Sequence, residues 1–361
     1  MRDDQDITSK IASKASPLRT TVPDDDLSDL GALKPCFENK SIVALGESTH
    51  GAREFFQTKH RLIRYLVTEL DVRVLGLEMG FTRTLPLNAY LIHGEGNPEE
   101  ILDGFGWLAR TESFLELVEW LREFNENNSR SEQVAIYGID IGSGKKSIDA
   151  VEAYLQEVDP DFSSEQSEQF ELLRSYREWN SGHRDQLSEE ASSFESILRN
   201  RFEDHEEEYV ATTSWEDWAY ANHHLDLYCQ AREYTMLNAG EQWIEAREHR
   251  DRSMADNVGW ALAYEEVDRI ALWAHDGHIR KGCVTSSTPD PAKTMGWYLN
   301  QRYEDKYYAI GFEFGEGSFQ ASPNPKRDDT EGLQEWSIDN PRSGSLPAVL
   351  QSVDGIISSW I

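Results

Sequence analysis

The chain has 361 residues, and its 66 Asp and Glu against 35 Lys and Arg give a formal net charge of −31. A surface this acidic repels nucleic acids and anionic membranes, so we exclude both as partners. The acidic residues are dispersed along the whole chain, a pattern that predicts a protein adapted to high salt, as in a halophile.

Cysteine content and the N-terminal segment bear on the cellular compartment. Three cysteines that lie far apart in the sequence do not predict a disulfide framework. The segment MRDDQDITSKIASKAS lacks the apolar stretch of a signal peptide, and no apolar run reaches membrane-spanning length. We therefore expect a cytoplasmic protein, whose oligomeric state the sequence does not indicate.

Short apolar segments separated by helical patterns predict an α/β fold with a mostly parallel central sheet flanked by helices. A polar arm at residues 1–40, with a helix at 25–33, precedes the first strand. Between the first two strands, apolar residues recur at helical spacing, which implies parallel strands joined by a right-handed crossover. A further amphipathic helix is expected at 111–125. The expected strands are residues 41–45, 72–77, 134–138, 269–274 and 307–314.

A long region without strand patterns separates the third and fourth expected strands. We interpret it as an inserted all-helical subdomain that covers a cleft at the carboxyl-terminal edge of the sheet. The chain then divides into a first half of the α/β core (1–144), the helical subdomain (145–262) and a second half of the core (263–361). Its tryptophans are interpreted as core residues, namely Trp215, Trp218, Trp243 and Trp260.

An acidic residue or a histidine follows each expected strand. Because the carboxyl ends of parallel strands meet at one edge of the sheet, where such folds bind ligands, these side chains should converge. A single acid at a strand end is more simply a helix cap or a solvated loop residue. The set as a whole favours a proton-transfer or metal site. Its members are Glu47, His50, Glu78, Asp140, His275, Asp276, His278 and Glu313.

The spacing of Glu47 and His50 suits general base catalysis. A carboxylate three residues before the histidine can bind one ring nitrogen and leave the other to accept a proton. His275 can supply a second base or acid. A cation just past the loop can stabilise an oxyanion, unless the candidates form only a solvated helix face. These candidates are Arg53, Lys59 and Arg61.

Two other classes of site are disfavoured by the sequence. No serine lies in a G-x-S-x-G motif, so a nucleophilic serine or cysteine is less favoured than activated water, although Ser48 in the loop stays open. The glycines and lysines at 142–146 lack the spacing of a P-loop and are interpreted as a turn.

Five sequence segments carry a resemblance to a known family. GESTHGAREFF (46–56), VLGLEMGF (74–81) and WAHDGH (273–278) are the main ones, with YGIDI (137–141) and REHRDRSMADNV (247–258) in the same order. Over about residues 42–314 the chain resembles the erythromycin esterase-like family, which includes macrolide-inactivating esterases and succinoglycan-biosynthesis-type relatives. The resemblance implies an α/β core with a helical subdomain over a cleft.

The resemblance also implies roles for individual residues. In the macrolide esterases, water attacks the lactone carbonyl with a histidine as general base. By position that base is His50, supported by Glu47 and Glu78, with His275 as the second imidazole. Lys59 stands where the drug-inactivating members have Arg. Asp276 stands where Asn is usual, which indicates a tuned histidine or a different substrate.

Three functional hypotheses remain open. The first is cofactor-free hydrolysis of a small-molecule ester or lactone, such as a macrolide antibiotic, by water that His50 activates. The second is a hydrolase in which Glu47, His50, Glu78 and His275 bind a divalent metal. The third is a non-catalytic protein that binds a carbohydrate or another small molecule. Substrate-binding or supporting roles are assigned to Arg53, Asp140, Asp276, His278 and Glu313.

Overall fold

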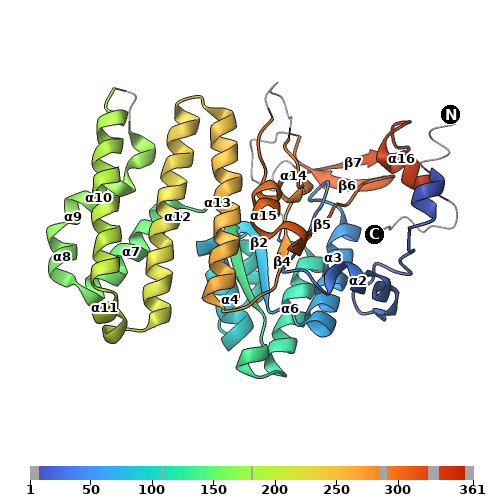
Figure 1. The fold of residues 1–361 in the computed structure, drawn as a ribbon, viewed down its shortest axis with the longest axis horizontal. Coiled ribbons are helices and arrows are strands. Elements are labelled where there is room, and N and C mark those ends of the chain that lie inside the picture. The colour runs from blue at the N-terminus through green and yellow to red at the C-terminus, as the bar shows by residue number, and fades with distance from the viewer. Residues whose placement is uncertain (1–7, 107–108, 180–181, 285–290, 324–332, 354–361) are drawn as a thin grey trace.

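The computed structural model describes residues 8–106, 109–179, 182–284, 291–323 and 333–353, and a five-stranded sheet forms its centre (Figure 1). The strand order is β3-β2-β4-β1-β5, and every neighbouring pair is parallel. The predicted α/β class is confirmed, although the last strand ends at residue 310 and not at 314. The strands are β1 (Ile42–Leu45), β2 (Val74–Gly80), β3 (Ala135–Asp140), β4 (Ile270–Trp273) and β5 (Tyr307–Ile310).

Several helices in the first part of the chain were not predicted from the sequence, and α4 (Phe81–His93) is the longest of them. This helix contains Pro86, which lacks a backbone N–H and is normally a signal for a helix end. The expected helix at 25–33 is a shorter 3-10 helix, η1 (Ser28–Leu33). The others are α2 (Lys34–Phe37), α3 (Arg53–Leu70), α5 (Pro98–Asp103), α6 (Glu112–Glu126) and the 3-10 helix η2 (Arg130–Glu132).

Between β3 and β4, the described residues form helices and no strand, as predicted. Figure 1 shows α8 to α11 on the side farthest from the sheet and α13 alongside it. The segment at 142–146 is not a turn but begins α7, where the Ser143 side chain caps the first turn. The division of the chain into two core halves and a subdomain stays a prediction. The helices are α7 (Gly144–Val158), α8 (Pro160–Glu165), α9 (Ser167–Arg174), η3 (Tyr176–Glu178), α10 (Arg184–Asp204), α11 (Glu206–Thr212), α12 (Trp215–Ala239) and α13 (Trp243–Tyr264).

The last part of the chain completes the sheet and adds a separate strand pair. Strands β6 (Gly317–Ala321) and β7 (Gln334–Ile338) pair antiparallel and were not predicted. Residues 356–360, an apolar stretch of the sequence, lie outside the described residues. The remaining elements are α14 (Asp276–Ile279), α15 (Met295–Tyr303), the 3-10 helix η4 (Glu304–Lys306) and α16 (Leu346–Gln351). Of the described helices, none is both long and apolar enough to cross a bilayer.

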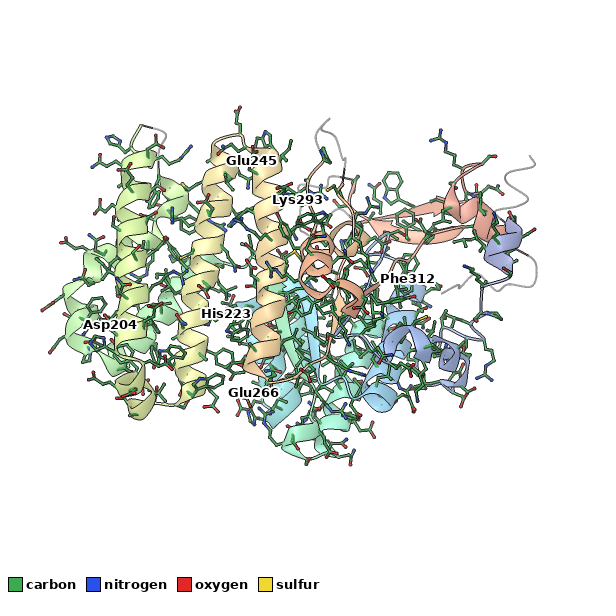
Figure 2. The ribbon with its side chains drawn as sticks, viewed as in Figure 1. Asp204, His223, Glu245, Glu266, Lys293 and Phe312 are labelled. Atoms are coloured by element: carbon green, nitrogen blue, oxygen red, sulfur yellow. The ribbon has the colours of Figure 1, made fainter. Side chains whose placement is uncertain are left out.

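The sheet is buried on both faces, which explains the continuous apolar character of its strands. Residues such as Leu62 and Leu117 pack from α3 and α6 on one face, and Met254 and Leu299 pack from α13 and α15 on the other. The helical region has its own core around Phe194. Figure 2 shows side chains filling the spaces between these helices and the sheet.

The assignment of all four tryptophans to the core is wrong for two of them. Trp260 packs into the core between α13 and the sheet, and Trp218 packs into the core of the helical region. Trp215 and Trp243 are 42% and 59% exposed. Each of these two is the first residue of its helix.

Lys59 and Arg61 on α3 do not belong to a solvated helix face, which was one of the two alternatives, because both side chains are fully buried. Arg61 forms an ion pair with Asp29 at 2.7 Å and donates to the carbonyl groups of Thr20 and Asp26. These contacts fix the N-terminal arm on α3. The burial could not be predicted from helical spacing, because it depends on where the arm lies.

We expect Asp29→Ala to lower the free energy of unfolding by about 3–5 kcal/mol, because it leaves Arg61 buried without its partner. Urea denaturation followed by circular dichroism measures this change. Asp24→Ala is the matched control, since the Asp24 side chain is 94% exposed in its pair with Arg64 and should cost at most about 1 kcal/mol. Equal losses for the two variants would contradict a structural role for the Arg61–Asp29 pair.

Candidate active site

The candidate site begins where β1 ends, at Gly46. The Gly46 N–H donates to the carbonyl of Ile310 at 2.8 Å, which continues the pairing with β5. A Cβ at this position would lie 1.8 Å from Oδ1 of Asp276, so only glycine lets the chain pass here. This close approach brings the loop after β1 against the loop after β4.

Glu47, His50 and Lys59 form one polar chain on this loop. The Glu47 carboxylate is buried; its Oε1 lies 2.5 Å from Nδ1 of His50 and its Oε2 lies 2.8 Å from Nζ of Lys59. Burial opposes ionisation of Glu47, but Lys59 and His50 outweigh it and lower its pKa. Burial likewise opposes the imidazolium of His50, but Glu47 and Glu78 raise the pKa of His50 above 6.5. The Lys59 ammonium also lies 4.5 Å from the ring centroid of Trp273.

Glu78 lies near the C-terminal end of β2, at an irregularity in the sheet. The register between β2 and β3 shifts between Leu77 and Gly80, and such bulges redirect a side chain at the end of a strand. Oε2 of Glu78 accepts the His275 backbone N–H at 2.7 Å, and Oε1 lies 3.3 Å from Nε2 of His278. Burial opposes ionisation, yet His278 and Arg250 keep the pKa of Glu78 well below its usual range.

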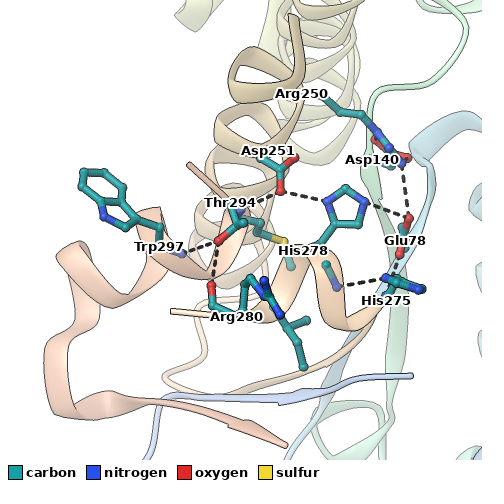
Figure 3. Close-up of polar contacts among 12 residues, drawn as sticks. Glu78, Asp140, Arg250, Asp251, His275, His278, Arg280, Thr294 and Trp297 are labelled. Carbon is teal, nitrogen blue, oxygen red and sulfur yellow. Dashed lines mark hydrogen bonds and ion pairs between the residues drawn. The ribbon is translucent and has the colours of Figure 1, made fainter. Parts of the chain in front are cut away.

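A buried network of charged groups surrounds Glu78 (Figure 3). Nδ1 of His278 lies 2.8 Å from Asp251, and Arg250 contacts Glu78 at 3.3 Å while binding both carboxylate oxygens of Asp140. Burial acts against the imidazolium of His278, but Glu78 and Asp251 raise its pKa to about 9. His278 is therefore protonated at neutral pH and acts as a fixed cation beside Glu78.

His275 lies opposite His50, with the ring centroids 5.1 Å apart. Its Nδ1 accepts the backbone N–H of Gly277 at 2.9 Å, which places the ring proton of the neutral form on Nε2. Burial and the neighbouring His50 lower the pKa of His275. The two histidines thus differ, since His275 is a neutral N–H donor and His50 carries a raised pKa.

The other predicted site residues lie at different distances from this centre. Asp276 is next to it, and burial raises its pKa to about 6 although its carboxylate accepts the Phe312 N–H at 3.3 Å. Glu313 is exposed, and its charge contributes to the raised pKa of Asp276. Arg53 is exposed at the start of α3, so no contact in the structure links it to the site. Asp140 reaches the site only through Arg250.

Two residues of the site were missed by the sequence analysis, namely Arg250 and Asp251. Both come from α13, far in sequence from any strand end, and strand-end reasoning cannot find them. They lie inside the segment 247–258 that carries part of the family resemblance, which was the available signal. Asp251 also accepts the backbone N–H of Met295 at 2.8 Å, so it joins α13 to the start of α15.

The loop after β1 also contacts the β6–β7 pair. The Gln320 backbone N–H donates to the Gly51 carbonyl at 3.2 Å. A Cβ on Gly51 would lie 1.8 Å from the carbonyl oxygen of Gln320. Glycine is therefore required for this contact, which holds the residue next to His50 against β6.

The donor groups do not fit the metal site considered in the sequence analysis. Both oxygens of Glu47 bind His50 and Lys59, and both oxygens of Glu78 bind groups that donate hydrogen. Within the ranges that the structure describes, no cluster of three or more His, Cys, Asp or Glu is arranged to hold a metal ion.

The hydroxyl of Ser48 is not placed to act as an activated nucleophile. Its Oγ is buried and has no hydrogen-bond partner among the described residues. A nucleophilic serine needs a base within hydrogen-bond reach. Water between the two histidines remains the simpler nucleophile.

Known sequences similar to this chain include an erythromycin esterase and a putative hydrolase. A family model described as erythromycin esterase matches residues 67–358. Erythromycin esterase type II of Escherichia coli is 24% identical, over 97% of this chain and 87% of that protein. A putative hydrolase of Bacillus subtilis (strain 168), YbfO, is 29% identical over 90% of this chain and 75% of that protein.

Solved structures show the same fold. A succinoglycan biosynthesis protein superposes with a TM-score of 0.82 at 24% identity, covering 98% of this chain and 85% of that chain. A mutant of the erythromycin esterase EreC in its open conformation superposes with a TM-score of 0.70 at 20% identity, covering 90% and 83%. Because the family model spans most of the sequence, this chain belongs to the erythromycin esterase family.

Proposed function

We propose that the chain hydrolyses carboxylic esters or lactones with water that His50 activates. The observation that carries this proposal is the buried Glu47 carboxylate on Nδ1 of His50. A carboxylate in this position fixes the ring orientation and makes Nε2 the nitrogen that takes up a proton. Lys59 balances the charge of Glu47 and holds it in place.

His275 has a complementary role in the proposal. Its ring carries the proton on Nε2 and is held by the Gly277 N–H. A neutral imidazole can donate a hydrogen bond to the carbonyl oxygen of the substrate and stabilise the negative charge that forms there. Glu78 positions this ring through the backbone of His275.

The reaction balances with water as the only co-reactant. His50 takes a proton from water, the oxygen forms a bond to the carbonyl carbon, and a tetrahedral oxyanion forms beside His275. The bond to the alcohol oxygen then breaks, and the His50 imidazolium returns its proton to the leaving alkoxide. The products are a carboxylic acid and an alcohol, which remain one molecule when the substrate is a lactone.

The relatives support the reaction class and leave the substrate open. They include proteins named as erythromycin esterases and a putative hydrolase. A macrolide is therefore the first substrate to test. Cleavage of its lactone would confer resistance to that antibiotic. A panel of small esters and lactones covers the alternatives, and binding without turnover would favour a carbohydrate or small-molecule binding protein.

His50→Gln should lower kcat on any ester or lactone that the wild type cleaves, by about 100- to 10,000-fold, because the general base is lost. Steady-state hydrolysis measured by pH-stat checks this, with circular dichroism to confirm folding. His205→Gln is the control, since His205 lies at the end of α10, where its ring bonds to the Arg201 carbonyl and stacks on Tyr209. A folded His50→Gln variant with wild-type kcat would refute the proposed mechanism.

The pH profile should reveal the raised pKa of His50. Only the neutral imidazole can accept a proton, so kcat/KM should rise with pH through a pKa above 6.5. Removing the charge in Glu47→Gln leaves burial as the main influence on His50, so this limb should move to lower pH while kcat falls. An unchanged limb in a folded Glu47→Gln protein would show that another group controls the profile.

Treatment with a chelator such as EDTA, followed by dialysis, should leave turnover unchanged, because the proposed steps involve no metal. Elemental analysis of the same sample gives the metal content. Loss of activity that a stoichiometric divalent metal restores would instead establish the metal-dependent hydrolase, with Glu47, His50, Glu78 and His275 as its ligands.

A further inference from the structure

A cavity lies away from the histidines, between α4, the start of α12 and the end of α13. Its volume is about 420 Å³. On one side, α4 contributes an apolar wall of Leu85, Ala89 and Ile92 together with the polar Asn88 and His93. Trp215, Tyr220 and Tyr264 line the opposite side. Glu265, which caps the C-terminal end of α13, lies at its base with Tyr137 of β3.

This cavity is on the opposite edge of the sheet from the candidate active site. Glu265 precedes β4, whereas His275 follows it. Arg250 of the site and Glu265 stand on the same helix, about 22 Å apart at roughly 1.5 Å per residue. In Figure 2 the neighbouring residue, Glu266, is labelled at the lower end of α13.

The aromatic wall is rigid because its rings are stacked on one another. Tyr264 lies between Trp260 and Trp215, with centroid distances of 4.9 and 5.3 Å and interplanar angles of 17° and 16°. The stack continues to His223, whose ring lies 3.9 Å from that of Trp260. Trp215 ends the stack and is 42% exposed. Its indole is thus fixed by packing while part of its surface faces solvent.

The carboxylate of Glu265 lacks a compensating cation. The side chain is half-buried and accepts a hydrogen bond from the Tyr137 hydroxyl. Among the residues that the structure describes, no Lys, Arg or His forms an ion pair with it. Arg130 also lines the cavity and keeps its charge, but it is exposed and donates to the Gln133 side chain at 3.3 Å and not to Glu265. A partly desolvated charge of this kind favours a counter-charge.

We propose that this cavity binds a small organic ammonium ion, with its charge near Glu265 and its carbon atoms against Trp215 and the apolar wall of α4. Aromatic rings attract cations through the negative potential of their faces, and a quaternary ammonium group also buries apolar surface. Glu216 at the first turn of α12 adds a second, exposed carboxylate to the lining. The site is separate from ester hydrolysis and does not require His50.

Choline chloride is the probe, and ligand-observed NMR titration at constant ionic strength gives its dissociation constant. The neutral isostere 3,3-dimethyl-1-butanol has the same shape without the charge. We expect it to bind at least about tenfold more weakly than choline, because the charge supplies the difference. Equal affinity of the two compounds would overturn the proposal and show only an apolar cavity. Tighter binding of methyl glucoside than of choline would overturn it in favour of a sugar site.

Variants distinguish the contribution of Glu265 to choline binding from that of Glu216. Glu265→Gln keeps an oxygen that can accept from Tyr137 and should weaken choline binding about tenfold or more. The matched change Glu216→Gln, at an exposed carboxylate, should weaken it less than about threefold. Trp215→Leu should also weaken it several-fold. Binding by a folded Glu265→Gln protein that equals wild type would refute the assignment of Glu265.

His50→Gln distinguishes this proposal from the proposed hydrolysis. The variant should bind choline with wild-type affinity even though its turnover is lost. Choline binding that disappears in His50→Gln while the protein stays folded would place the ammonium ion in the candidate active site, and would overturn the assignment to this cavity.

Discussion

The buried carboxylate of Glu78 is the group on which the rest of the site depends. It accepts the backbone N–H of His275 and contacts both His278 and Arg250, so it joins β2 to the loop after β4 and to α13. An ionised carboxylate can be buried only if such partners compensate its lost hydration. The cations that stabilise Glu78 therefore also fix the position of the helical region relative to the sheet.

The surroundings of His50 and His275 shift the pKa values of the two facing imidazoles in opposite directions. Glu47 binds the side chain of His50 and favours its protonated form. Glu78 instead binds the backbone of His275, and the ring nitrogen of His275 is occupied by a backbone N–H that favours the neutral form. One sheet edge thus holds two imidazoles with opposite pKa shifts, whose ring centroids lie 5.1 Å apart. The division of roles follows from which atoms the two carboxylates contact.

Sequence patterns predicted the part of the structure that depends on the sheet. Strands buried on both faces must be continuous apolar runs, so their ends, and with them Glu47, Glu78 and His275, could be located. The exposed β6–β7 pair has no such pattern, and Pro86 concealed α4. Arg250 and Asp251 reach the site because α13 packs on one face of the sheet. The burial of Lys59 and the pairing of Arg61 with Asp29 are likewise tertiary effects, which helical periodicity does not contain.

The contact between β6 and the loop after β1 has a consequence for how this fold can diversify. It is made by main-chain atoms of Gly51 and Gln320, and only the glycine side requires a particular amino acid. Outward-facing side chains of β6 and β7 can therefore change without moving the loop that holds His50. The sequence of the strand pair can thus vary while the two histidines keep their geometry.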